Sequence, residues 1–125
     1  MLFDTDVLIW VFRGNESAAQ LVERTDPRHL SVISYMELLQ GARDRREWRT
    51  IKSFLADFAF QTVPLGENIG HRASIYMEQH GLKMALGVAD ALVAATAVEN
   101  ALTLCTANRK HYRHIAELDI RLFRP

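Results

Sequence analysis

The sequence has little of what marks several common protein classes. Cys105 is its one cysteine, so no disulfide can form within the chain, and we expect a cytoplasmic protein with a buried, structural thiol. No apolar run approaches the roughly 20 residues that cross a bilayer, and no basic segment precedes the apolar run Val7–Phe12. A disulfide-stabilised scaffold, a transmembrane protein and a signal peptide are therefore not expected.

Motifs for several kinds of catalysis are also missing. There is no glycine-rich phosphate loop, no G-x-S-x-G nucleophile turn and no C-x-x-C pair, and the five histidines lack zinc-ligand spacing. Net charge is zero, with 15 basic and 15 acidic side chains, so a nucleic-acid partner can be judged only from local clusters. We therefore place candidate chemistry on the acidic residues.

What the sequence does contain is an alternation of short apolar runs and longer helical patterns. Its 125 residues suffice for one domain, residues 1–125, and 49% apolar and 24% charged residues are typical of a soluble globular protein. The alternation predicts an α/β fold with a largely parallel sheet. The expected strands are Met1–Phe3, His29–Ile33, Gln61–Pro64, Leu102–Cys105 and Ile120–Phe123. The expected helices are Val7–Phe12, Glu16–Arg24, Ser34–Gly41, Arg45–Phe58, Glu67–His80, Val88–Val98 and Asn108–Glu117.

Three polar residues, Asp4, Thr5 and Asp6, follow the first strand directly. Ligand sites in parallel α/β sheets lie beyond the carboxyl ends of the strands, so this stretch is predicted to form the floor of a site. The structural alternative is that Thr5 or Asp6 simply caps a helix. That alternative explains one polar residue better than it explains three in a row.

Glu37, Asn108 and Asp90 are the other candidates. Glu37 follows the second strand, although it also fits a capping box that begins at Ser34. Asn108 follows the fourth strand and, taken alone, is better explained as a helix cap. Asp90 is the one charged residue on an otherwise apolar helix, where a stranded charge is costly. Asp90 is therefore expected to be paired, solvated or metal-bound, although its spacing alone does not direct it to the other acids.

Several carboxylates at one sheet edge would repel one another unless protons or a cation neutralised them. Oxygen ligands without histidine or cysteine favour a hard ion, Mg²⁺ or Mn²⁺, over zinc. Such sites typically orient a water and shield charge in phosphoryl chemistry. The acidic residues thus predict a Mg²⁺ or Mn²⁺ site that acts on phosphate.

Basic residues gather in two segments. Arg109, Lys110 and Arg113 follow Asn108 closely, and their place beside the predicted site favours contacts with a nucleic-acid backbone. The segment Arg43–Lys52 holds five basic and two acidic residues. A solvated helix face is the preferred interpretation of that segment.

With these residues in place, the whole chain resembles PIN-domain ribonucleases of the VapC toxin type. The resemblance rests on four segments in order and at ordinary spacing: Leu2–Ile9, Ser34–Gly41, Ala89–Ala97 and Leu104–Tyr112. It implies a PIN-like three-layer α/β/α fold whose central parallel sheet has four to five strands in the order 3-2-1-4-5. It also implies that Asp4, Glu37 and Asp90 hold Mg²⁺ or Mn²⁺, which brings Asp90 to the site.

Some positions depart from the family pattern. Asn108 stands where many PIN nucleases have a fourth acid, and His111 stands where some relatives have another. Asn108 would still serve catalysis by holding a water or a ligand through its amide oxygen. Asp6, where the family often has asparagine, would be auxiliary together with Thr5 and Thr106. The missing charge at position 108 puts a second metal ion in doubt.

The function implied by this resemblance is a Mg²⁺- or Mn²⁺-dependent endoribonuclease that acts as the toxin of a toxin–antitoxin pair. The implied partners are an RNA substrate and a VapB-like antitoxin, and the implied assembly is a homodimer or a dimer of toxin–antitoxin dimers. Two alternatives stay open. One is a haloacid-dehalogenase-like phosphatase with Asp4 as nucleophile, and the other is a degenerate PIN fold that binds RNA or protein without cutting.

Overall fold

A parallel sheet of five short strands organises the fold, in a computed structural model that describes all 125 residues. The strands are β1 (Leu2–Phe3), β2 (His29–Ser31), β3 (Gln61–Val63), β4 (Leu104–Thr106) and β5 (Ile120–Leu122). Their order is β3-β2-β1-β4-β5, and every neighbouring pair is parallel. The expected order is confirmed. Because β1 is the central strand, its carboxyl end lies in the middle of the edge that the strand carboxyl ends form.

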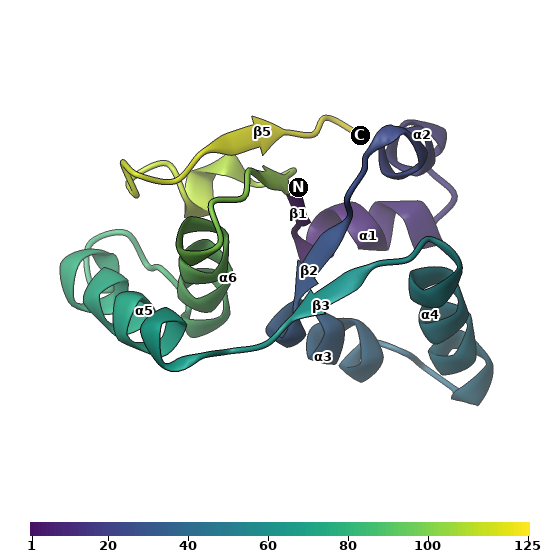
Figure 1. Cartoon of the computed structure of the whole chain (residues 1–125), viewed down its shortest axis with the longest axis horizontal. Coiled ribbons are helices and arrows are strands. Elements are labelled where there is room, and N and C mark those ends of the chain that lie inside the picture. Colours follow the sequence, from purple (N-terminus) through teal and green to yellow (C-terminus); the bar gives the residue numbers. More distant parts are fainter.

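Six α-helices surround this sheet (Figure 1). They are α1 (Thr5–Phe12), α2 (Glu16–Arg24), α3 (Val32–Gln40), α4 (Arg45–Asp57), α5 (Glu67–His80) and α6 (Val88–Glu99). Figure 1 shows α5 and α6 together on one side of the sheet and α1, α2 and α4 on the other. The expected three-layer α/β/α architecture is therefore confirmed. Each of the helices is too short or too polar to traverse a lipid bilayer.

Each face of the sheet has its own hydrophobic core, and strand residues alternate between the two. Leu2 and Leu104 pack with α5 and α6, whereas Phe3 and Cys105 pack with residues of α1 to α4. All four are fully buried, as both faces of a parallel sheet usually are. Burial raises the pKa of the Cys105 thiol to about 11, which leaves little reactive thiolate. The expected structural role of this cysteine is confirmed.

The segment after β4 does not form the expected helix Asn108–Glu117. One turn of 3-10 helix, η1 (Arg109–His111), is followed by further turns. The backbone N–H groups of Tyr112, Ile115 and Leu118 each donate to the carbonyl three residues earlier. These side chains belong to the core beneath α5 and α6. A spacing of three suits successive 3-10-type turns, and this packing overrides the α-helical periodicity.

Two helices begin earlier than the sequence predicts. β2 ends at Ser31, whose hydroxyl accepts the Ile33 N–H at 3.2 Å, so Ser31 and not Ser34 is the N-cap of α3. The capping-box interpretation of Glu37 is therefore wrong. α1 begins at Thr5 and not at Val7. β4 is also displaced, since it begins two residues later than expected and includes Thr106.

Arg28 ties together the ends of two helices. Its Nε donates to the Val22 carbonyl at 2.6 Å and its Nη2 to the Glu23 carbonyl at 2.9 Å, both in the last turn of α2. Its Nη1 donates to the carbonyl of Phe58, the C-cap of α4, at 2.7 Å. One planar guanidinium thus bridges α2 and α4 across their carboxyl ends.

Arg28→Lys is expected to lower the free energy of unfolding by about 2 kcal/mol, since a hydrogen bond to a charged group is worth roughly 1.5–3 kcal/mol and one ammonium cannot reach all three carbonyls. Urea unfolding measures the change. Arg124→Lys, at an exposed position with no side-chain hydrogen bond, is the matched control. Equal stability of the two variants would contradict the bridging role.

Candidate functional site

The site lies at the carboxyl edge of the sheet, around Asp4. This residue is the N-cap of α1, and its Oδ1 accepts the Thr5 N–H at 2.9 Å. The structural alternative, in which Thr5 or Asp6 caps the helix, is therefore wrong, because the cap is Asp4 itself. Only 8% of Asp4 is exposed, because it follows the central strand directly.

Thr106, at the end of β4, connects Asp4 to Asp6. Its hydroxyl oxygen lies 2.8 Å from Asp4 Oδ2 and 3.3 Å from Asp6 Oδ2. The Ala107 N–H donates to the same Asp6 oxygen at 3.1 Å, whereas Asp6 Oδ1 is buried without a hydrogen-bond partner. Two aspartates thus flank one hydroxyl, and no cationic side chain is bonded to either.

Asp90 enters the site from the first turn of α6. Its Oδ1 lies 3.1 Å from the hydroxyl of Tyr112, and that hydroxyl lies 2.9 Å from Asp4 Oδ2. Its Oδ2 lies 3.1 Å from His111 Nδ1. Asp90 is therefore paired, as expected for a charge on an apolar helix.

Asn108 joins the same network from the turn after β4. It stands at the N-cap position of η1, as the capping interpretation predicts, but its side chain makes no capping hydrogen bond. Its Nδ2 lies 3.0 Å from His111 Nε2, and its backbone N–H donates to the Thr106 hydroxyl at 3.1 Å. Asn108 is therefore connected to Asp4 through Thr106 and to Asp90 through His111.

Glu37 reaches the site through Thr5. The Thr5 hydroxyl donates to Glu37 Oε1 at 2.9 Å, and the Glu37 side chain is otherwise exposed on α3. Seven predicted residues therefore gather at one sheet edge: Asp4, Thr5, Asp6, Glu37, Asp90, Thr106 and Asn108. They share a network but not a common point, since no three acidic, histidine or cysteine side chains converge closely enough to hold a metal ion.

The electrostatics of the site show excess negative charge. Burial, together with the charge of Asp6, raises the pKa of Asp4 to about 7, against the opposing effect of three hydrogen bonds. Burial also raises the pKa of Asp6. At neutral pH the metal-free site therefore readily takes up a proton.

The predicted RNA-binding residues surround this edge without entering the acidic network. Arg109 and Lys110 lie in η1 and Arg113 two residues beyond it, and all three are exposed. Arg113 donates to the His114 ring at 3.2 Å, and none of the three is bonded to a site carboxylate. Their charges are available to an approaching ligand.

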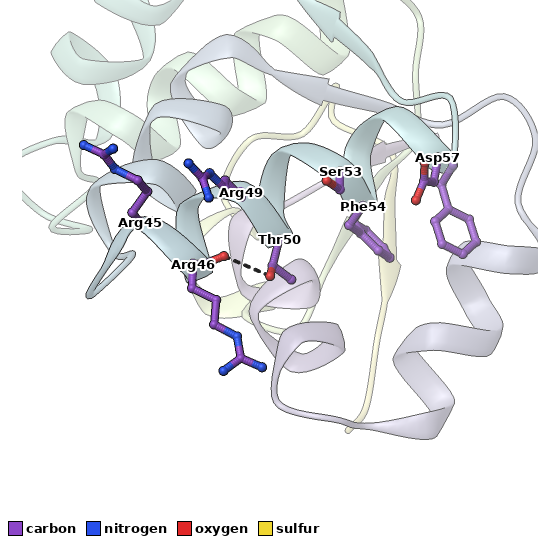
Figure 2. A pocket seen from close by; sticks show the side chains of 8 residues that line it. Arg45, Arg46, Arg49, Thr50, Ser53, Phe54 and Asp57 are labelled. Carbon is purple, nitrogen blue, oxygen red and sulfur yellow. Dashed lines mark hydrogen bonds between the residues drawn. The ribbon is translucent and has the colours of Figure 1, made fainter.

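The second basic segment lies mainly along α4, and two of its residues, Arg43 and Arg46, also line a second pocket that includes Glu37. Figure 2 shows Arg45 and Arg49 extending to one side of the helix and Arg46 to the other. The shallow pocket that they line includes no residue of the acidic network. Their guanidinium groups do not converge, an arrangement typical of a solvated helix face.

Tyr112 is the site residue to which sequence reasoning gave no role. The expected helix Asn108–Glu117 concealed its position, because a helical path does not place its hydroxyl at the strand ends. One signal was available. Tyr112 is the one Phe, Tyr or Trp residue in the polar segment 108–114, and a tyrosine that buries its ring usually needs a hydrogen-bond partner for its hydroxyl.

Comparisons with known proteins identify the family of this fold. The PIN domain family matches residues 1–118. Ribonuclease VapC10 of Mycobacterium tuberculosis is 34% identical, over 94% of this chain and 90% of that protein. A toxin–antitoxin complex from Klebsiella pneumoniae contains a similar chain, with a TM-score of 0.79, 29% identity and coverage of 94% and 93%. VapBC2 from Rickettsia felis, bound to a promoter DNA fragment, shares the fold with a TM-score of 0.81, 19% identity and 98% coverage of each chain. The chain therefore belongs to the PIN-domain family and groups there with the VapC proteins.

Proposed function

We propose that this protein is a Mg²⁺- or Mn²⁺-dependent endoribonuclease. The observation that carries the proposal is the buried Asp4, which shares Thr106 with Asp6 and Tyr112 with Asp90. Concentrated carboxylates at a sheet edge are suited to a hard cation, and hard cations serve phosphoryl chemistry. RNA is the proposed substrate because the related proteins from M. tuberculosis and R. felis are named ribonucleases.

The donor set around Asp4 fits such a cation. Every ligand atom that the acidic residues offer is an oxygen, and Asp6 Oδ1 is buried without a partner. The pKa of Asp4 is raised by its burial and then by the charge of Asp6, and a bound cation would offset both effects. Asp4, Glu37 and Asp90 would hold the ion, with Asp6 as an auxiliary ligand. Because no three acidic side chains converge, binding would draw the exposed Glu37 side chain closer to Asp4 and Asp90.

Each residue of the network has a distinct part in the proposed hydrolysis. When bound, the ion supplies a Lewis acid for the scissile phosphate and lowers the pKa of a coordinated water. Thr106 bridges Asp4 and Asp6, and the Asn108 amide oxygen would hold a water or a ligand. The exposed residues Arg109, Lys110 and Arg113 would hold the RNA backbone through phosphate contacts.

The phosphatase alternative has no support. The hydrogen-bond partners of Asp4 are Thr5, Thr106 and Tyr112, with no lysine among them. A nucleophilic aspartate would also need an open approach, and Asp4 is 8% exposed. Asp4 is thus better suited to holding an ion than to attacking a phosphate.

Asp4→Asn and Asp90→Asn are each expected to reduce RNA cleavage by about a hundred- to a thousandfold, the usual effect of removing one group that stabilises charge in a transition state. Initial rates with saturating Mn²⁺ measure this, and Asp57→Asn, on the exposed end of α4, is the control. Cleavage that survives both substitutions or excess EDTA would contradict the metal mechanism. Mn²⁺ binding without cleavage by the unmodified protein would favour the non-cutting PIN alternative.

Mn²⁺ is expected to bind more weakly as the pH falls below about 7. Below that pH a proton occupies Asp4 and must leave when the ion binds, so the apparent affinity should fall by about tenfold for each pH unit. Calorimetric titration across this range measures the trend. Asp4→Asn should bind more weakly and lose most of the pH dependence. An affinity that is flat with pH would contradict the involvement of Asp4.

We further propose that the protein is the toxin of a pair and that a VapB-like antitoxin restrains it. The similar chain from K. pneumoniae lies in a toxin–antitoxin complex and is 29% identical, which supports this partner class. An antitoxin arginine would suit the acidic site, because a guanidinium pairs with carboxylates through two hydrogen bonds.

Induced expression of this chain alone is expected to arrest bacterial growth, whereas Asp90→Asn should not, because only the former cleaves RNA. Growth curves and the level of intact RNA measure both effects. Co-expression of a cognate VapB-like antitoxin should restore growth. Equal growth of the two strains at equal protein levels would contradict the toxin role.

A further inference from the structure

Tyr112 is fully buried, and its hydroxyl is placed between two carboxylates of the site. Its ring packs in the core beneath α5 and α6. Its hydroxyl oxygen lies 2.9 Å from Asp4 Oδ2 and 3.1 Å from Asp90 Oδ1. Packing alone would be served equally well by phenylalanine, whereas a buried hydroxyl is costly without a hydrogen-bond partner. The hydroxyl therefore needs an explanation separate from that of the ring.

This hydroxyl is the one direct hydrogen-bond bridge between Asp4 and Asp90. Thr106 connects Asp4 to Asp6, and Thr5 connects it to Glu37, but the hydroxyl of neither threonine is hydrogen-bonded to a residue of α6. A phenol has a single proton, so it donates to one carboxylate at a time while its oxygen stays close to both. The bridge thus sets the separation of a strand-end carboxylate and a helix carboxylate that would otherwise repel each other.

The hydrogen bonds of Asp4 also determine which of its lone pairs is left over. A carboxylate has about four acceptor positions. Oδ2 accepts from Thr106 and Tyr112, and Oδ1 accepts from the Thr5 N–H. Both acceptor positions on Oδ2 are therefore occupied, one of them by the Tyr112 hydroxyl. One acceptor position remains unoccupied, and it is on Oδ1.

We propose that Tyr112 is a positioning residue whose hydroxyl orients Asp4 and Asp90 for a divalent cation. It holds the two carboxylates at a fixed separation and leaves one acceptor position on Oδ1 of Asp4, beside the Thr5 N–H, for the ion. Hydrogen-bond partners of metal ligands act in this way in many sites, and their loss usually costs about 10- to 100-fold in metal affinity or activity. This inference rests on the proposed metal-dependent function.

Tyr112→Phe isolates the hydroxyl, because it keeps the ring and its packing. The variant is expected to keep its fold, to bind Mn²⁺ about tenfold more weakly and to lower kcat for RNA cleavage by about 10- to 100-fold. KM for RNA should stay unchanged, since Tyr112 is buried and cannot touch the substrate. Mn²⁺ calorimetry, cleavage kinetics and circular dichroism supply the three measurements.

Tyr76→Phe is the matched control. Tyr76 is also a buried tyrosine of the α5–α6 core, 4% exposed, and its hydroxyl donates to Glu117, which is not part of the acidic network. This control should leave Mn²⁺ affinity and kcat unchanged. A loss of both in Tyr76→Phe as well would overturn the inference, because it would trace the effect to core packing.

The outcomes distinguish a failure of this inference from a failure of the proposed metal-dependent function on which it rests. If the unmodified protein binds Mn²⁺ and cuts RNA while Tyr112→Phe does both equally well, the positioning role alone is overturned. If the unmodified protein neither binds Mn²⁺ nor cuts RNA, both proposals are overturned. A Tyr112→Phe variant that loses its helical signal would also overturn the inference, because the hydroxyl would then serve the fold itself.

Discussion

The burial of a carboxylate at the end of the central strand is the constraint on which the rest of the site depends. Asp4 follows β1 directly and is almost closed off from solvent, so its oxygens must find hydrogen-bond donors inside the protein. Three segments supply them: the start of α1, the end of β4 and the turns after it. Residues more than a hundred positions apart meet here because the buried carboxylate of Asp4 needs hydrogen-bond donors.

Residues from both layers of helices build the site. Asp4 and Asp6 belong to the side of the sheet covered by α1, whereas Asp90 and Tyr112 belong to the side covered by α5 and α6. The two hydrophobic cores are separated by the sheet, so the carboxyl edge is where side chains from both sides can touch.

Much of this arrangement is readable in the sequence, and the exceptions have physical causes. An apolar strand that runs into Asp4 reveals the site, and the charge of Asp90 on an apolar helix requires a partner. Ser31 and Ser34 are equally good caps by chemistry, and only the length of β2 selects Ser31. The turns after β4 depend on core packing, which local periodicity does not report. Tyr112 was missed for that reason alone.

β1 has only two residues, and each is committed to a different core. Leu2 faces α5 and α6, Phe3 faces the opposite layer, and the Met1 carbonyl is held by the His29 N–H at 3.0 Å. Inserting or deleting one residue here would exchange the two side chains between cores of different shape and turn the carboxylate toward the other layer. The length of this strand is thus as much a part of the site as the acid that follows it. Substitutions at this edge can alter the chemistry of the site while the strand stays in register. A change in the length of β1 would instead move the carboxylate out of the site.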